Sequence, residues 1–191
     1  MRYRPEHKTE IHQKIVKDAS RRLRAEGLTG AAVSSVMRDA GLTHGGFYKH
    51  FGSKDDLLLE SLSEGFREIE DRLAQAGEQS KPGTAWRAIV KTYLSLEHCD
   101  HAERGCPMTV LASELARVDK SMKGQVVAEL VNYKQRMLPF MPGRRIVDKE
   151  RAFFSIFSTM IGAIEIARLL PDPAMREKVL TSASDFLFRS F

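Results

Sequence analysis

The segment from Gly27 to Lys54 constrains the fold of this chain more than any other part of its sequence. From Val33 to Ala40, apolar residues recur at the i, i+3, i+4 and i+7 spacing that places them on one face of a helix. Gly41 then supplies a residue that tolerates positive φ, where a helix ends. Thr43 follows, and we expect its hydroxyl to cap a second helix. Two short helices joined by such a turn form a helix-turn-helix.

The second helix of this motif is predicted to span His44 to Phe51. Only Phe47 and Phe51, one turn apart, can contribute to a core, whereas the other face is polar and basic. Gly45 and Gly46 each weaken a helix by about 1 kcal/mol relative to alanine. Their presence indicates that the backbone approaches another surface closely. A slim, basic helix of this kind suits insertion into the major groove of DNA.

Positive charge is concentrated around this motif. Residues 1–54 contain 11 Lys and Arg against 5 Asp and Glu, a balance of +6. The remaining residues contain 19 basic and 20 acidic side chains, a balance of −1. Basic residues that only solvate a surface would not be segregated in this way. The distribution indicates a phosphate-binding surface on one part of the molecule.

The rest of the chain shows helical periodicity and no strand pattern, which predicts an all-α fold. A first helix is expected from Thr9 to Gly27, and a long helix that follows the cap Ser53 connects the head to the body. The segment 152–167 is apolar almost all round, which predicts burial on more than one side. We also expect loops over 77–83 and 98–106, a helix cap at Asp119 or Ser121, and another at Asp148.

Composition limits the class of protein further. The two cysteines, Cys99 and Cys106, are too few for a disulfide framework, which indicates a reducing compartment. No run of about eighteen apolar residues occurs, and residues 1–10 lack the apolar segment of a signal peptide. We therefore expect a soluble, cytoplasmic protein with no membrane partner.

The helix-turn-helix resembles the DNA-binding signature of TetR/AcrR-type repressors, and the resemblance continues through residues 51–57 into the next helix. The residues that carry it are Gly27, Thr29, Val33, Val36, Ala40, Gly41, Thr43, Gly45, Phe47, Tyr48, His50, Phe51 and Lys54. By this resemblance, residues 1–54 form a helix-turn-helix DNA-binding domain with a three-helix head. Residues 55–191 then form a helical effector-binding and dimerisation domain.

The resemblance also implies the partners. The last two helices of each subunit would pair in a homodimer, which agrees with the all-round apolarity of segment 152–167. The DNA partner would be a double-stranded operator. A dimer presents one recognition helix to each of two successive major grooves, so this operator should be close to palindromic.

The DNA contacts follow residue by residue from the same resemblance. Thr43, Tyr48, His50 and Lys54 are expected to contact phosphates, and His44, Gly46 and Lys49 to face base edges. Lys49 can donate to a guanine edge, whereas Gly46 offers only its backbone and close approach. An alternative role for Tyr48 is that of a half-buried aromatic that braces Phe51.

The effector site is expected in the C-terminal body, on helices that surround a cavity in this family. The candidate lining residues there are Trp86, Tyr93, Met108, Leu111, Phe157 and Met160. Glu165 is a lone acid within an apolar helix, and if buried it could bind a cationic or hydrogen-bonding ligand. Alternatively the aromatic residues and methionines are core, and Glu165 pairs with Arg168 or Arg151.

Cys106 precedes Pro107 at an expected helix start and lies close to Arg104, where a helix dipole and a cation would lower the pKa of the thiol. Such a thiolate would react with electrophiles or oxidants, as in repressors of this family that sense them. A small buried hydrophobe is the alternative. His98, Cys99 and His101 lie nearby, but their irregular spacing does not predict a metal site, and no cofactor is expected.

These observations predict a DNA-binding transcriptional regulator, most simply a repressor that a small molecule or a thiol-reactive compound releases from its operator. Three alternatives remain open: a thiol-based electrophile or redox sensor acting through Cys106, an architectural protein that binds DNA without sequence preference, and activation instead of repression. A thiol enzyme is a fourth reading. It is not favoured, because the sequence supplies neither an oxyanion hole nor a cofactor loop.

Overall fold

The computed structural model describes residues 5–191, without the side chains of Pro5, Glu6, Ala31 and His44. Every regular element in this range is helical, which confirms the predicted all-α class. In chain order the elements are α1 (Pro5–Glu26), η1 (Leu28–Ala31), α2 (Val33–Asp39), η2 (His44–Lys49), α3 (Lys54–Glu78), α4 (Ala85–Tyr93), α5 (Leu96–Asp100), η3 (Ala102–Arg104), α6 (Met108–Leu115), α7 (Lys120–Met137), η4 (Leu138–Phe140), α8 (Ile146–Arg168) and α9 (Pro173–Ser190).

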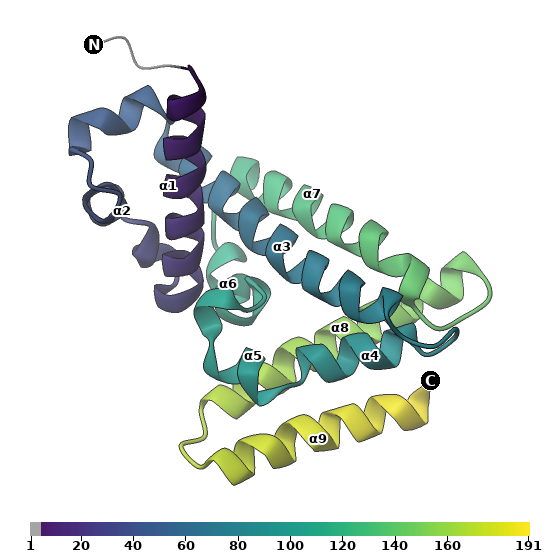
Figure 1. Cartoon of the computed structure of the whole chain (residues 1–191). Coiled ribbons are helices and arrows are strands. Elements are labelled where there is room, and N and C mark those ends of the chain that lie inside the picture. The colour runs from purple at the N-terminus through teal and green to yellow at the C-terminus, as the bar shows by residue number, and fades with distance from the viewer. Residues whose placement is uncertain (1–4) are drawn as a thin grey trace.

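The N-terminal head consists of α1, α2 and η2, with α2 and η2 on one side of α1 (Figure 1). Its small core joins Ile15 and Ala19 of α1 to Met37 of α2 and Phe47 of η2. Leu57, in the first turn of α3, packs into the same core. The long helix α3 therefore begins in the head and continues into the body.

The body is built from α3 to α9 around a second, larger hydrophobic cluster. Figure 1 shows α7 running beside α3, α8 and α4 crossing below them, and α9 at the end of the molecule farthest from the head. Leu23 of α1 and Leu28 of η1 pack against this body cluster. The end of α1 thus contacts the body as well as the head, and any shift of the body in this region acts on the head.

Most predicted helix ends are confirmed because they depend on local chemistry. Gly27 and Gly41 take φ values of 74° and 73°, which favour glycine. The Ser53 hydroxyl accepts the Asp56 N–H at 3.0 Å. The Asp119 carboxylate caps α7 as expected. Asp148 is not the first residue of the cap, because α8 begins at Ile146, but its carboxylate accepts the Arg145 N–H at 3.4 Å and so takes part in capping the helix.

Two predicted loops differ from the structure. Helix α3 continues to Glu78, which shortens the loop expected over 77–83. The segment 98–106 is not a polar connection, because it contains the end of α5 and all of η3. His98, Cys99 and Cys106 are buried there. The carbonyls of His98 and Cys99 accept from Arg168, about 70 residues along the chain, a contact that a polar sequence pattern does not reveal.

Candidate DNA-binding surface and effector site

The recognition segment η2 is a 3-10 helix and not the α-helix that the sequence predicted. Its Gly46 N–H bonds to the backbone carbonyl of Thr43 at 2.9 Å. The Thr43 side chain makes no capping hydrogen bond, so the predicted hydroxyl cap is wrong. Two consecutive glycines disfavour a regular α-helix and permit the tighter turn.

No packing within the chain requires the two glycines of η2. Neither Gly45 nor Gly46 has a positive φ. A Cβ added at Gly45 would meet nothing within 4 Å, and one at Gly46 would lie 3.6 Å from the Met37 Cε, an ordinary van der Waals distance. Because alanine fits at both positions, the absence of side chains matters only to a partner outside the chain.

Aromatic packing holds η2 on the head. Phe47 and Phe51 are buried and stack with 5.3 Å between ring centroids. The His12 ring of α1 stacks on the Phe51 ring, with 4.6 Å between the ring centroids. Tyr48 contacts Phe47 edge-on at 5.2 Å but is 72% exposed. Tyr48 is therefore not the half-buried brace of Phe51 that the sequence offered as an alternative, and its ring is available to a partner.

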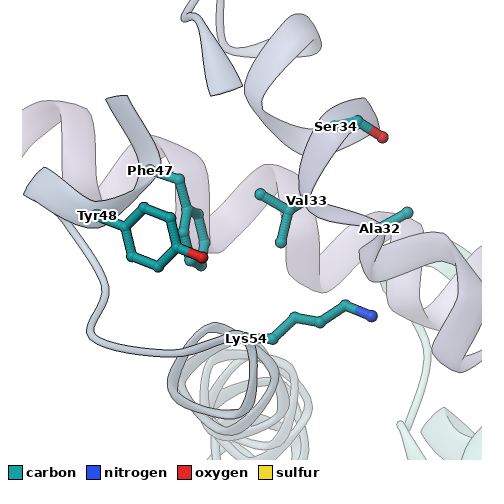
Figure 2. Close-up of a pocket in the computed structure, with 6 residues that line it drawn as sticks. All are labelled: Ala32, Val33, Ser34, Phe47, Tyr48 and Lys54. Carbon is teal, nitrogen blue, oxygen red and sulfur yellow. The ribbon is translucent and has the colours of Figure 1, made fainter. Parts of the chain in front are cut away.

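A surface hollow of about 360 Å³ opens beside Tyr48, between η2, α2 and the start of α3. It is lined by Ala32, Val33, Ser34, Phe47, Tyr48 and Lys54. Figure 2 shows the Tyr48 hydroxyl on one side of the hollow and the Lys54 side chain extended along another. A hydroxyl donor and an ammonium at one opening suit a phosphate group.

The two lysines of this face, Lys49 and Lys54, are not paired with acidic side chains of the described chain. Among the described residues, no carboxylate forms an ion pair with Lys49 or Lys54, and both side chains are exposed. Arg22, in contrast, is held by Asp39 at 2.5 Å on the side of the head near η1. Lys49 and Lys54 therefore present unpaired positive charge beside η2, as expected for a surface that meets phosphates.

His50 differs from the lysines. It is half-buried, and its Nδ1 atom has no hydrogen-bond partner among the described residues. Burial lowers the pKa of His50, and the positive charges of His12, Lys8 and Lys49 lower it further. His50 can therefore offer a phosphate a neutral N–H group, not a cation. The side chain of His44 lies outside the described residues.

The candidate effector residues form a packed core. Trp86, Tyr93, Leu111, Phe157 and Met160 are all buried, and Met108 is half-buried. The cavity in this region measures only about 10 Å³, room for one water molecule at most. It is lined by Ile89, Tyr133, Met137, Met141, Phe153, Ile156, Phe157 and Met160.

Only Phe157 and Met160 of the predicted set line this cavity. Trp86 instead packs against Phe188 and Phe191 of the C-terminal segment, with ring centroids 5.6 and 6.2 Å away. Tyr133 and Met137 also line the cavity, and they were not among the candidates, because periodicity alone does not show which core residues border a void.

Glu165 does not fulfil the expectation of a buried acid. Its side chain is exposed on α8, on the side that faces away from the body core. It forms no ion pair within the described chain. The pairing with Arg168 is also absent, because that guanidinium donates to the carbonyls of His98, Cys99 and Thr109 at 2.9, 3.0 and 3.4 Å.

The expectation of an activated thiol at Cys106 is contradicted. Cys106 is 0% exposed, and burial raises the pKa of its thiol above the ordinary value. Arg104, the cation invoked from the sequence, is exposed and lies 3.3 Å from Glu103. In this conformation Cys106 is a buried, protonated thiol, which is a poor nucleophile.

A set of polar contacts that the sequence did not reveal joins the head to the body. Arg24 at the end of α1 is 0% exposed and donates to the Gly105 carbonyl at 3.1 Å and to Glu68 at 2.5 Å. The Glu114 carboxylate of α6 accepts the Leu28 N–H at 2.9 Å. The buried Arg24–Gly105 bond thus joins α1 to the segment before α6, and the part-buried Leu28–Glu114 bond joins η1 to α6. We call these contacts the head–body contact.

Neither a metal site nor a membrane-spanning helix is found in the described part of the chain. No three His, Cys, Asp or Glu side chains there are grouped to hold a metal ion. None of the described helices combines the length and apolarity needed to cross a membrane.

Comparison with known proteins agrees with the geometry of the head. Residues 15–61 match the family model described as bacterial regulatory proteins, tetR family. The HTH-type transcriptional regulator LmrA of Bacillus subtilis (strain 168) is 27% identical over 104 residues. That match covers 53% of this chain and 55% of LmrA, so the chain spans about half the length of this curated relative.

Solved structures share the whole fold. A TetR transcriptional regulator from Chloroflexus aurantiacus J-10-FL superposes with a TM-score of 0.75 at 23% identity, over 96% of each chain. A TetR-family regulator from Cytophaga hutchinsonii gives the same TM-score at 17% identity, over 98% of this chain and 97% of that one. The head of the chain, residues 15–61, thus matches the tetR family of bacterial regulatory proteins, and the whole chain has the fold of solved TetR-family transcriptional regulators.

Proposed function

We propose that the protein is a homodimeric repressor that binds a palindromic operator through η2 and is released when an effector binds its body. The single observation that carries the proposal is the outer face of η2. That face combines the exposed Tyr48 and Lys49 with two glycines that nothing inside the chain requires. A bare backbone flanked by unpaired cations is what close approach to a major groove demands.

The contacts divide into two kinds. Tyr48 and Lys54 border the hollow and bind a backbone phosphate, with Thr43 and His50 contacting neighbouring phosphates. Lys49 and the Gly46 backbone, together with His44, face base edges. Phosphate contacts fix the register of the protein, and base contacts supply sequence preference.

The proposed dimer uses α8 and α9. Helix α9 lies at the end of the molecule farthest from the head, packed against α8 (Figure 1). The two helices and the residues that directly follow them expose large apolar side chains. These are Phe154, Ile166, Leu169, Met175, Phe186 and Phe191. Exposed aromatic and aliphatic side chains in such number mark an interaction surface. Pairing this face with its copy would let two η2 segments meet grooves roughly 34–36 Å apart.

The head–body contact supports coupling between effector and operator. Arg24 lies near the end of α1 and Leu28 at the start of η1, and both donate hydrogen bonds to the segment 105–114. An effector that displaces this segment would tilt α1 and change the distance between the two η2 segments of the dimer. If the distance between the two η2 segments no longer matches the distance between successive major grooves, both segments cannot bind at once, and the affinity for the operator falls.

The thiol-sensor alternative requires an additional step. A reagent reaches Cys106 only after the body opens, because the thiol is buried and protonated. An enzymatic Cys–His pair is not supported. The His98 Nε2 atom accepts the Cys106 N–H at 2.9 Å and its Nδ1 atom donates to the Tyr93 carbonyl at 2.7 Å, so neither nitrogen is free to act as a base on the thiol.

The test is selection of a binding sequence from a random duplex pool, followed by titration of the selected duplex and a scrambled one. We expect a palindromic winner preferred by about 10³-fold or more. Lys49→Ala should lower the affinity, and Lys81→Ala, an exposed lysine in the loop after α3, is the matched control. Equal affinity for both duplexes would replace the repressor with an architectural DNA-binding protein.

A further inference from the structure

His12 of α1 contacts α3 and the two residues that directly follow η2. Its Nε2 atom lies 2.6 Å from the Glu60 carboxylate of α3. Its ring stacks on Phe51 with 4.6 Å between ring centroids, and it lies beside the His50 ring with 6.1 Å between centroids. One side chain of α1 therefore connects the long helix α3 to His50, a residue expected to contact a backbone phosphate.

His50 lacks the hydrogen bond that would normally orient its ring. Its Nδ1 atom is buried and has no partner among the described residues. In a histidine that binds through one ring nitrogen, the hydrogen bond of the other nitrogen usually fixes the ring and its tautomer. Packing has to replace that bond here. The rings of His12 and Phe51 lie beside His50, with centroid distances of 6.1 and 6.4 Å.

The Glu60 carboxylate fixes the His12 ring in turn. An ionised carboxylate can only accept hydrogen bonds, so the Nε2 atom of His12 carries a hydrogen and donates it to Glu60. Both side chains are partly shielded from water, with exposed fractions of 28% for His12 and 44% for Glu60. The hydrogen bond holds the imidazole in its stack on Phe51 and leaves it little freedom to rotate.

The other charged groups near Glu60 are already engaged. Glu60 borders a surface hollow together with Glu64, Arg67 and Glu129. Glu64 is paired with Arg67 at 2.7 Å, and Glu129 accepts a serine hydroxyl at 2.8 Å. These contacts leave the Glu60 carboxylate as the partner of His12.

Positive charge faces His50 from two elements. Burial lowers the pKa of His50 most, and the charges of His12 and Lys8 on α1 and of Lys49 in η2 lower it further. A cationic His50 would also place an N–H group on the buried Nδ1 atom without an acceptor, which is unfavourable. Near pH 7 His50 is therefore a neutral ring whose hydrogen is carried by Nε2, the nitrogen that can donate to a phosphate.

We propose that His12 is a positioning residue of the DNA-binding surface: Glu60 fixes its ring, and its ring holds His50 as an oriented, neutral donor to a backbone phosphate. The role rests on the proposed function, because it requires that η2 and the residues beside it meet operator phosphates. His12 itself does not touch the DNA in this arrangement and acts through His50.

Orientation is tested at pH 8, where ordinary histidines are neutral. The full chain is titrated with the selected duplex at one fixed salt concentration. His12→Ala and His50→Gln should each weaken binding by about threefold to tenfold, as loss of one hydrogen bond does. The double variant should bind no more weakly than His50→Gln alone, because coupled residues are not additive. Glu60→Gln keeps an acceptor for His12 and should bind more tightly than Glu60→Ala.

His12→Phe separates the charge of His12 from its packing. A phenylalanine can still stack on Phe51, so the melting temperature should stay close to that of the natural chain. Without the positive neighbour, His50 should take up its proton at a higher pH, followed by the ring ¹H and ¹⁵N signals of His50 in the absence of DNA. A cationic donor binds a phosphate more strongly than a neutral one does. Between pH 8 and pH 6, the factor by which His50→Gln weakens binding should therefore grow more steeply in the His12→Phe chain than in the natural one.

His101 is the matched control, since its Nδ1 atom lies 3.4 Å from the Glu103 carboxylate in the body. His101→Phe should change neither the ring signals of His50 nor the affinity for the duplex.

Two results would overturn the positioning role: losses that add fully in the double variant, or a His50 titration that is unchanged in His12→Phe. The ring signals are recorded without DNA, so they separate this role from the proposed function. If no duplex is selected from the pool, the proposed function fails, and the ring signals still show whether His12 controls His50. If a duplex is selected but His50→Gln binds it as the natural chain does, the phosphate contact of His50 and the role of His12 both fail while the repressor remains.

Discussion

Replacement of Arg24 by methionine tests the head–body contact. The substitution keeps much of the side-chain volume but removes the donors to Glu68 and to the Gly105 carbonyl. Removing one partner of a buried ion pair costs about 3–5 kcal/mol. Glu68 is 25% exposed and can recover some hydration, which reduces that cost, whereas the stranded Gly105 carbonyl adds about 1–3 kcal/mol. We expect a loss of about 3 kcal/mol in the free energy of unfolding.

The assay is urea unfolding followed by far-ultraviolet circular dichroism. Arg67→Met is the matched control, because Arg67 also binds carboxylates on α3 but is half-exposed. Its loss should cost less than about 1 kcal/mol. If Arg24→Met destabilises the chain no more than this control does, the buried contact does not join head and body as described.

Three further predictions follow from single residues. His98 is buried, and burial lowers its pKa to about 4, so the unfolded chain binds the proton at a higher pH than the folded chain does. The free energy of unfolding should therefore fall as the pH drops below about 6.5, by about 3 kcal/mol near pH 4. Urea titrations of His98→Gln should lack most of this pH dependence. Gly45→Ala should raise the melting temperature slightly, since the added Cβ meets no atom within 4 Å. The same variant should bind the selected duplex more weakly than the natural chain does in a gel-shift titration. Phe186→Glu should convert the dimer into monomers in analytical ultracentrifugation, because a carboxylate would be buried in the proposed interface; a dimer that persists would move the interface elsewhere.

The helix boundaries that the sequence predicted well are those set by short-range chemistry. These boundaries depend on contacts within one helical turn, so the neighbouring residues in the sequence are enough to predict them. The residues concerned are Gly27, Gly41, Ser53 and Asp119. The recognition segment begins at His44 as predicted, but it ends at Lys49 and not at Phe51, and it is a 3-10 helix. There the two glycines weaken the α-helical hydrogen bonding that the spacing alone suggested.

Long-range packing explains the errors in the body. The reactivity expected of Cys106 depended on exposure, and its burial is decided by the hydrophobic cluster of the body in which it lies. Arg24 looked like one more basic residue of the head, whereas its partners lie on α3 and beside Cys106. A pocket volume depends on how side chains from several helices meet. For that reason the sequence could predict that the candidate effector residues are buried, but it could not predict which of them line a cavity.

The boundary expected between residues 54 and 55, and the individual DNA and effector contacts, remain predictions. Leu57 packs with the head core, so a head fragment that ended at residue 54 would lack part of that core. Mutational tests of the DNA contacts should therefore use the full chain.

The most direct test of the central claim is the dependence of affinity on half-site spacing. The selected palindrome is titrated beside a version with five base pairs inserted between its half-sites, which rotates one half-site by about half a helical turn. A dimer with one η2 segment in each of two successive major grooves should bind the lengthened duplex about 100-fold more weakly, or worse. Equal affinity for the two duplexes would contradict recognition by a paired, symmetric surface.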